Sequence, residues 1–219
     1  MNLRVERRGR VDYAETFAAM RRFTTDRGVE TPDEIWLLEH PPVYTLGLNA
    51  DPAHVLAAGD IPVLRTDRGG QVTYHGPGQL VAYVLLDLGR RALGVRALVS
   101  LLEQAVVATL ARYGIEAASN PRAPGVYVAG AKVASLGLRI RRNCSYHGLA
   151  LNVAMDLAPF ARINPCGFEG LRVTQLAELG GPTDLDRVGR DLEAALRAGL
   201  GTLPDDAADR PGIGEQPRA

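Results

Sequence analysis

The middle of the chain contains three strand-like segments in close succession, at residues 125–128, 132–140 and 146–153. Within the second segment, apolar Ala134, Leu136, Leu138 and Ile140 alternate with Val133, Ser135, Gly137 and Arg139. This period of two predicts a β-strand that turns one face toward a core. The succession of strands favours a mixed or antiparallel sheet over strict βαβ winding.

Helices and further strands are expected on both sides of this region. Apolar residues recur at helical spacing in residues 12–27 and 95–113, and Gly114 follows the second of these where a left-handed cap is typical. The remaining expected elements are a brief helix at 51–58, a helix at 185–200, and strands at 34–39, 43–46, 61–65 and 80–86. Four glycines and a proline predict a loop at 68–78.

These elements predict a single α/β (α+β) domain with mixed, largely antiparallel sheets flanked by helices. We expect the domain to cover residues 1–203. Residues 204–219 contain prolines, glycines and charges without periodicity, which predicts a disordered tail. A domain of this size buries roughly 70% of the surface of its unfolded chain, so it needs no disulfide or metal to fold.

The charge balance argues against some classes of binding partner. Twenty-five basic side chains match 25 acidic ones, which argues against nucleic acid as the main partner. No apolar run approaches the ~20 residues that cross a bilayer, so no membrane association is expected. The first residues lack the apolar segment of a secretory signal, and the two cysteines, Cys144 and Cys166, form no CxxC motif. We therefore expect a cytoplasmic protein with free thiols.

One lysine stands out against this composition. Of the 25 basic residues, 24 are arginine and only Lys132 is lysine. Arginine keeps its proton in proteins, whereas a lysine amine can lose it. Composition alone is also compatible with chance.

The remaining chemistry-bearing residues allow both structural and functional interpretations. Cys166 lies between a proline and a glycine on a rigid turn, where its thiol could face a cleft, although free cysteines are often small buried hydrophobes. Cys144 has no neighbour that suggests reactivity. His40 and His54 resemble scaffold or surface residues, while glycines next to His75 and His147 could open a cavity to their rings.

The glycine-rich loop is also open to two interpretations. Gly70, Gly76 and Gly78 leave backbone N–H groups accessible to a polar ligand or an oxyanion, but the same glycines would suit a wide turn. The loop lacks the GK[ST] sequence of a phosphate-binding P-loop.

Four runs of sequence together resemble one family. They are RGGQVTYHGPGQLVAY at 68–83, GVYVAGAKVASLGLR at 125–139, YHGLALNV at 146–153 and INPCG at 163–167. Their order and spacing closely resemble the lipoyl(octanoyl) transferases of lipoate biosynthesis, whose fold resembles the catalytic domain of biotin and lipoate protein ligases.

The resemblance implies specific roles for residues in these runs. Cys166 would be the acyl-thioester nucleophile, and Lys132 its partner. The segments expected to bind the acyl chain are Arg68, Gly69, Gly70, Gln71, Val72, Thr73, Tyr74 and His75, then Ser135, Leu136 and Gly137, then Gly148, Leu149 and Ala150. The resemblance implies no cofactor and no metal.

The implied reaction moves an octanoyl group from octanoyl-acyl carrier protein to Cys166. The group then passes to a lysine amine on the lipoyl domains of 2-oxoacid dehydrogenase complexes and on the glycine cleavage H protein. We hypothesise a basic patch for the acidic carrier protein, composed of Arg90, Arg91, Arg139, Arg141 and Arg142, with a solvated face as the alternative. Two rival functions are an ATP-dependent lipoate or biotin ligase and a noncatalytic protein that binds acyl groups.

Overall fold

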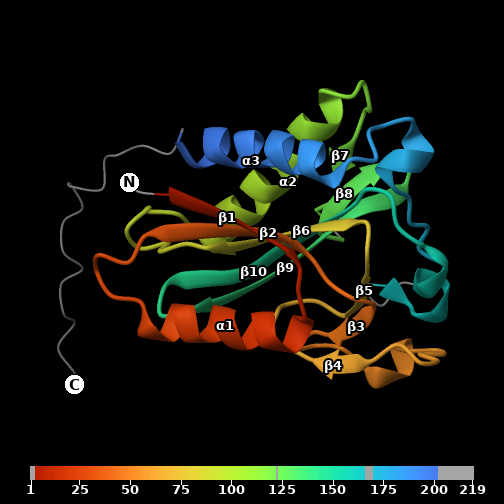
Figure 1. Ribbon diagram of the computed structural model, residues 1–219, viewed down its shortest axis with the longest axis horizontal. Helices are drawn as coiled ribbons and strands as arrows, with labels where there is room; N and C mark the ends of the chain where they lie inside the picture. The colour runs from red at the N-terminus through yellow and green to blue at the C-terminus, as the bar shows by residue number, and fades with distance from the viewer. Residues whose placement is uncertain (1–2, 122, 166–169, 202–219) are drawn as a thin grey trace, which may run out of the picture.

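The computed structural model describes residues 3–121, 123–165 and 170–201. Two sheets and three α-helices make up this part of the chain (Figure 1). The large sheet contains β1 (Leu3–Arg10), β2 (Asp33–Glu39), β6 (Gln79–Leu85), β7 (Ala118–Ser119), β8 (Gly125–Val128), β9 (Ala131–Arg141) and β10 (Cys144–Asn152). The small sheet contains β3 (Val43–Leu46), β4 (Val63–Arg65) and β5 (Val72–His75).

Strand pairing confirms the predicted mixed, largely antiparallel architecture. The large sheet has the order β1-β2-β6-β10-β9-β8-β7, and only the β1–β2 pair in it is parallel. In the small sheet, of order β4-β3-β5, β3 pairs in parallel with β4 and antiparallel with β5. The succession of strands from 125 to 153 therefore forms the antiparallel β8-β9-β10 unit that the sequence predicts.

Helices cover the two faces of the large sheet. Helices α2 (Val95–Ala111) and α3 (Leu185–Gly201) lie on one face, and α1 (Tyr13–Asp26) lies on the other (Figure 1). Asp12 begins α1 by accepting a hydrogen bond from the backbone N–H of Glu15 at 3.0 Å. Short 3₁₀ turns occupy Pro52–His54, Ala158–Arg162 and Leu176–Leu179.

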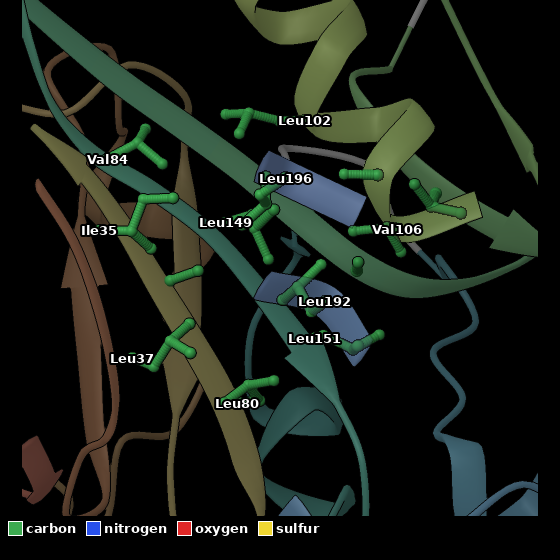
Figure 2. Packing of buried hydrophobic residues seen from close by; sticks show 14 of the residues in the cluster. Ile35, Leu37, Leu80, Val84, Leu102, Val106, Leu149, Leu151, Leu192 and Leu196 are labelled. Carbon is green, nitrogen blue, oxygen red and sulfur yellow. The ribbon is translucent and has the colours of Figure 1, made fainter. Parts of the chain in front are cut away.

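The main core lies between the large sheet and helices α2 and α3. Figure 2 shows side chains of this core, contributed by both the sheet and the helices. Its labelled members are Ile35, Leu37, Leu80, Val84, Leu149 and Leu151 from the sheet, Leu102 and Val106 from α2, and Leu192 and Leu196 from α3. Alternate residues of the same strands, including Trp36, Tyr83 and Ala150, pack against α1 on the opposite face. Strands β6 and β10 are consequently buried on both faces, as is usual for the centre of a covered sheet.

Three details of the expected secondary structure are wrong. The predicted loop at 68–78 contains strand β5, because its Val-Thr-Tyr-His segment pairs with β3. The brief helix expected at 51–58 is a single 3₁₀ turn. Strand β1 was not predicted, since it is polar and owes its place to parallel pairing with β2. The predicted tail at 204–219 lies outside the described residues.

A buried carboxylate gathers three arginines beside the start of β2. Asp33 is fully buried, and its oxygens lie 2.8 Å from Arg27 and Arg90 and 2.5 Å from Arg91. Arg91 is itself buried. The hypothesis that Arg90 and Arg91 belong to a surface patch is therefore wrong for Arg91, and Arg90 already pairs with Asp33.

No helix within the described ranges is long and apolar enough to cross a membrane.

Asp33→Asn should reduce the free energy of unfolding by about 3 kcal/mol at neutral pH, because it leaves clustered arginines without their buried counter-charge. Burial opposes ionisation of Asp33, but the backbone N–H of Asp87 and the Arg91 guanidinium outweigh it and lower its pKa. The stabilisation is therefore present above the ordinary Asp pKa of about 3.9 and is lost as the pH falls through the folded value. Urea unfolding of both proteins across this range measures it. Glu6→Gln, at a partly exposed ion pair with Arg8, is the control and should cost under about 1 kcal/mol. Equal losses in the two variants would contradict the prediction.

Candidate functional site

A cavity opens on the α1 side of the large sheet, between β9, β10 and the small sheet. It encloses about 510 Å³ of space free of atoms, including its opening to solvent. The structure places around it Arg68, Gly70, Gln71, Val72, Thr73, His75, Ser135, Leu136, Gly137, Gly148, Leu149 and Ala150. Segments that lie far apart in the sequence, all selected by the family resemblance, thus surround one space.

Two of the predicted binding residues lie outside the cavity wall. Gly69 donates its backbone N–H to the carbonyl of Leu138 at 2.8 Å, which attaches the loop to β9. Tyr74 packs with Tyr44 and Phe160 in the core of the small sheet. Their placement indicates that they support the wall of the cavity.

Four further residues line the cavity: Tyr13, Val81, Tyr83 and His147. His147 was a candidate from its glycine neighbour, but the other three were not predicted. Tyr13 begins helix α1 and lies outside the four runs that carry the family resemblance. Val81 and Tyr83 belong to the strand predicted at 80–86. The helical pattern of α1 gave no signal that its first aromatic residue would reach the cavity.

Two glycines let the backbones around the cavity approach closely. Gly137 and Gly148 face each other across the β9–β10 pair. A Cβ atom at Gly148 would lie 2.0 Å from the carbonyl oxygen of Ala82, which is far inside van der Waals contact. A Cβ at Gly137 would meet the carbonyl oxygen of Gly69 at 3.0 Å and Cδ of Arg68 at 3.2 Å. Side chains at these positions would displace the strand or the loop that forms the wall.

The Arg68 side chain is buried and is held at the cavity by the small sheet. Its Nη2 donates to the backbone carbonyl of Thr45 at 2.6 Å and to Thr45 Oγ1 at 2.8 Å, and its Nη1 donates to the carbonyl of Gly69 at 3.0 Å. These bonds fix the guanidinium in one orientation and place a positive charge in an otherwise largely apolar wall.

Two buried histidines near the cavity are neutral. Burial lowers the pKa of His40 to about 4 and that of His75 to about 3. His40 donates from Nδ1 to the carbonyl of Val11 at 2.8 Å and accepts from the Tyr83 hydroxyl at Nε2. It is thus a scaffold residue, as its sequence context indicated.

His147 adopts an unusual backbone conformation within β10. Its φ angle is +60°, which is uncommon for a residue with a side chain. The ring stacks on Phe17 of α1 and on Tyr146, and Nε2 lies 3.0 Å from Asp67. Burial lowers the pKa of His147 despite the opposing effect of Asp67, so the ring is neutral and donates from Nε2 to the carboxylate. The strained conformation holds the ring at the edge of the cavity.

Lys132 lies almost at the start of β9, three residues before Ser135 of the cavity wall. Its side chain is 1% exposed, Nζ donates to the carbonyl of Pro124 at 3.2 Å, and Nζ lies 5.2 Å from the centre of the Tyr127 ring. Gly125 makes room for the amine, since a Cβ there would meet Cε at 3.0 Å.

A β-bulge corrects the predicted alternation at this point. Strict alternation would place Lys132 on the same face as Ala134, toward α2 and α3. The β8–β9 register shifts at this point, and both Val133 and Ala134 join the main core. The extra residue turns Lys132 to the opposite face, which is the face of Ser135 and the cavity.

Cys166 and its neighbours at 167–169 lie outside the described residues, so the structure does not test its proximity to Lys132. The chain on both sides is described. Ile163 bridges to Val55, and Val173 bridges to Lys132 itself. The backbone of Lys132 donates to the carbonyl of Arg172 at 2.8 Å and accepts from Thr174 at 2.9 Å.

Cys144, the other cysteine, is buried at the start of β10, and burial raises the pKa of its thiol. This agrees with its prediction as a structural residue. Among the residues that the structure describes, no group of three His, Cys, Asp or Glu side chains is placed to hold a metal ion.

Comparison with known proteins identifies relatives over most of the chain. Residues 12–197 match the Lipoyl protein ligase A/B catalytic domain family. The octanoyltransferase of Alkalilimnicola ehrlichii is 60% identical over 191 residues, covering 87% of this chain and 89% of the relative. The octanoyltransferase of Methylococcus capsulatus is 64% identical over 172 residues, covering 78% and 83%.

Solved structures share the fold at low sequence identity. A putative lipoate protein ligase from T. acidophilum has a TM-score of 0.74 at 16% identity, covering 92% of this chain and 86% of that one. The biotin protein ligase from Aquifex aeolicus in complex with biotin and ATP has a TM-score of 0.56 at 15% identity, covering 94% and 72%. These likenesses confirm the predicted fold class.

His40→Gln should make the stability less dependent on pH. An unfolded histidine has a pKa of about 6.5, whereas folded His40 stays neutral down to about 4. In this pH range the unfolded state binds a proton at this histidine and the folded state does not. The free energy of unfolding therefore falls as the pH drops through this range. Removing the histidine should reduce the slope of unfolding free energy against pH by up to about 1.4 kcal/mol per unit, measured by urea unfolding between these values. An unchanged slope would show that folded His40 titrates normally.

Proposed function

Because the chain belongs to the Lipoyl protein ligase A/B catalytic domain family, we propose that it transfers octanoyl groups from octanoyl-acyl carrier protein to lysine amines of lipoyl domains. One observation carries the proposal. The segments expected to bind an acyl chain surround a single cavity, and the only lysine of the chain lies three residues from its wall. Relatives about 60% identical are octanoyltransferases.

The cavity suits a saturated acyl chain. Val72, Val81, Leu136, Leu149 and Ala150 contribute apolar surface to it. Burial of an octanoyl chain at ~0.8 kcal/mol per methylene supplies on the order of 5 kcal/mol of binding free energy. The depth of the cavity would then select the length of the chain.

The chemistry proceeds through two acyl transfers. The thiolate of Cys166 attacks the carrier thioester, the bond from the acyl carbon to the carrier sulfur breaks, and the carrier thiol leaves with a proton. The lysine amine of the lipoyl domain then attacks the Cys166 thioester, an amide forms, and the Cys166 thiol is released. The second transfer is favourable because an amide is more stable than a thioester, and no ATP is consumed.

Lys132 is proposed to move the protons. A free thiol has a pKa near 8.5 and is only a few per cent ionised at neutral pH, so it needs a base or a cation close by. A lysine amine can accept the thiol proton, and the resulting ammonium stabilises the thiolate. In the second transfer the amine can take the proton of the incoming lysine. Two sets of backbone N–H groups are candidates for the oxyanion, one in residues 70–75 and one at the turn of Cys166.

The proposed acceptors are the lipoyl domains of 2-oxoacid dehydrogenase complexes and the glycine cleavage H protein. The acidic carrier protein would need a basic surface. Arg139, Arg141 and Arg142 are exposed near the β9–β10 turn and remain the proposed docking residues after Arg90 and Arg91 are assigned to Asp33.

The covalent mechanism predicts a stable intermediate. Incubation with octanoyl-acyl carrier protein, without ATP, should add one octanoyl group to the protein in an intact mass spectrum, and hydroxylamine should remove it because it is a thioester. Cys166→Ala should gain no adduct, while Cys144→Ser should gain one as wild type does. A requirement for ATP would favour the ligase alternative, and reversible binding without an adduct would favour the binding protein.

Lys132→Arg tests the proton transfer. Arginine keeps the positive charge but cannot release a proton, so the rate of octanoyl transfer should fall by roughly two to four orders of magnitude, the usual contribution of acid–base catalysis. Single-turnover transfer to a lipoyl domain measures the rate, with thermal unfolding to verify the fold. A near-normal rate would limit Lys132 to an electrostatic role.

A further inference from the structure

We propose that Asn152 and Gln79 are positioning residues for Lys132, acting through a buried chain of hydrogen bonds that begins at the cavity. The proposal rests on the role of Lys132 in the proposed function. Neither side chain belongs to the segments assigned to acyl binding, and neither lines the cavity.

The chain of hydrogen bonds has four links. His75 of the cavity wall donates from Nδ1 to Gln79 Oε1 at 2.8 Å, and Gln79 Nε2 donates to Asn152 Oδ1 at 3.0 Å. Asn152 Nδ2 then donates to the backbone carbonyl of Thr174 at 2.9 Å. Finally, the backbone N–H of Thr174 donates to the carbonyl of Lys132 at 2.9 Å.

The chemistry of the partners sets the direction of every link. The carbonyls of Thr174 and Tyr74 can only accept, so they orient the amide nitrogens of Asn152 and Gln79, respectively. Gln79 Oε1 is thereby left facing His75, which must carry its proton on Nδ1. All four links therefore donate in the same sense, from the cavity toward Lys132. If any residue of the chain exchanged its donor and acceptor, a neighbouring group would lose its hydrogen-bond partner.

Burial makes these links costly to break. Gln79, Asn152 and Thr174 are 2%, 4% and 7% exposed, and Lys132 is 1% exposed. In such surroundings an amide that loses its partner is not rescued by bulk water. The chain therefore holds a single geometry, as fully satisfied polar networks do.

The last link determines where Lys132 lies. Its backbone is held between the carbonyl of Arg172 and the N–H of Thr174, in the segment that follows the Pro-Cys-Gly motif. Asn152 attaches this segment to β10, at the centre of the large sheet. Without the Asn152 amide, the segment after Cys166 would lose its attachment to β10. The backbone of Lys132, which is bonded to that segment, would then be held less firmly relative to it.

The test measures how readily the Cys166 thiol ionises, because in the proposed function that property depends on the Lys132 amine. Iodoacetamide reacts with thiolate, and peptide mass mapping separates Cys166 from buried Cys144. In the wild type, the pH midpoint of Cys166 alkylation should lie below that of an ordinary thiol. Asn152→Leu, similar in branching shape but without hydrogen bonds, should raise this midpoint by about one pH unit and slow alkylation about tenfold at pH values well below the midpoint.

Ser145→Ala is the matched control. Ser145 lies at the other end of β10, is fully buried, and donates to the carbonyl of Val84 at 2.8 Å. This variant should lose stability but keep the wild-type midpoint, since its hydrogen bond does not lead to Lys132. If Asn152→Leu fails to fold, Gln79→Met breaks the chain one link earlier and should shift the midpoint in the same direction.

The outcomes separate the positioning role from the proposed function. The Cys166 midpoint could be depressed in the wild type and stay depressed in Asn152→Leu or Gln79→Met. That result would overturn the positioning role while leaving the Cys166–Lys132 pair intact. An ordinary midpoint in the wild type would overturn the pair, and the positioning role with it.

Discussion

The close contact between the backbones of β6 and β10 determines the geometry of the site. Strand β10 is buried along its whole length, and at Gly148 the absence of a side chain lets the carbonyl oxygen of Ala82 lie only 2.0 Å from the point where a Cβ atom would be. This contact keeps the two central strands in register from Gly148 to Asn152. The part of the cavity wall at residues 148–150, the imidazole of His147 and the amide of Asn152 all belong to this one strand.

Three buried polar groups at or beside the cavity, His40, His75 and Arg68, are each stabilised by their own hydrogen-bond partners. His40 and His75 stay neutral, and the Arg68 charge is surrounded by the oxygens of Thr45 and Gly69. The cavity therefore combines a mostly apolar surface with a rigid polar frame. In the proposed function, such a frame would hold the acyl chain away from water and protect a thioester from hydrolysis.

The fold class and most of the cavity wall were predictable from the sequence. The alternation in residues 132–140 and the apolar runs of β6 and β10 are local signals that predict the sheet, whereas the cavity-lining segments were predicted from the resemblance of four sequence runs to one family. Features that depend on distant partners were not predictable. Strand β5 needs β3 to form, Arg91 is buried because Asp33 lies beneath it, and Tyr13 reaches the cavity only through the packing of α1.

The bulge at Val133 makes the position of Lys132 depend on the length of β9 rather than on the identity of any one side chain. The face on which Lys132 lies is determined by the number of residues between it and Ser135, because one extra residue is accommodated there. Substitutions at Val133 would alter packing but preserve that number. Deletion of a single residue would instead rotate the amine to the helix side of the sheet, so β9 tolerates change in composition far better than change in length.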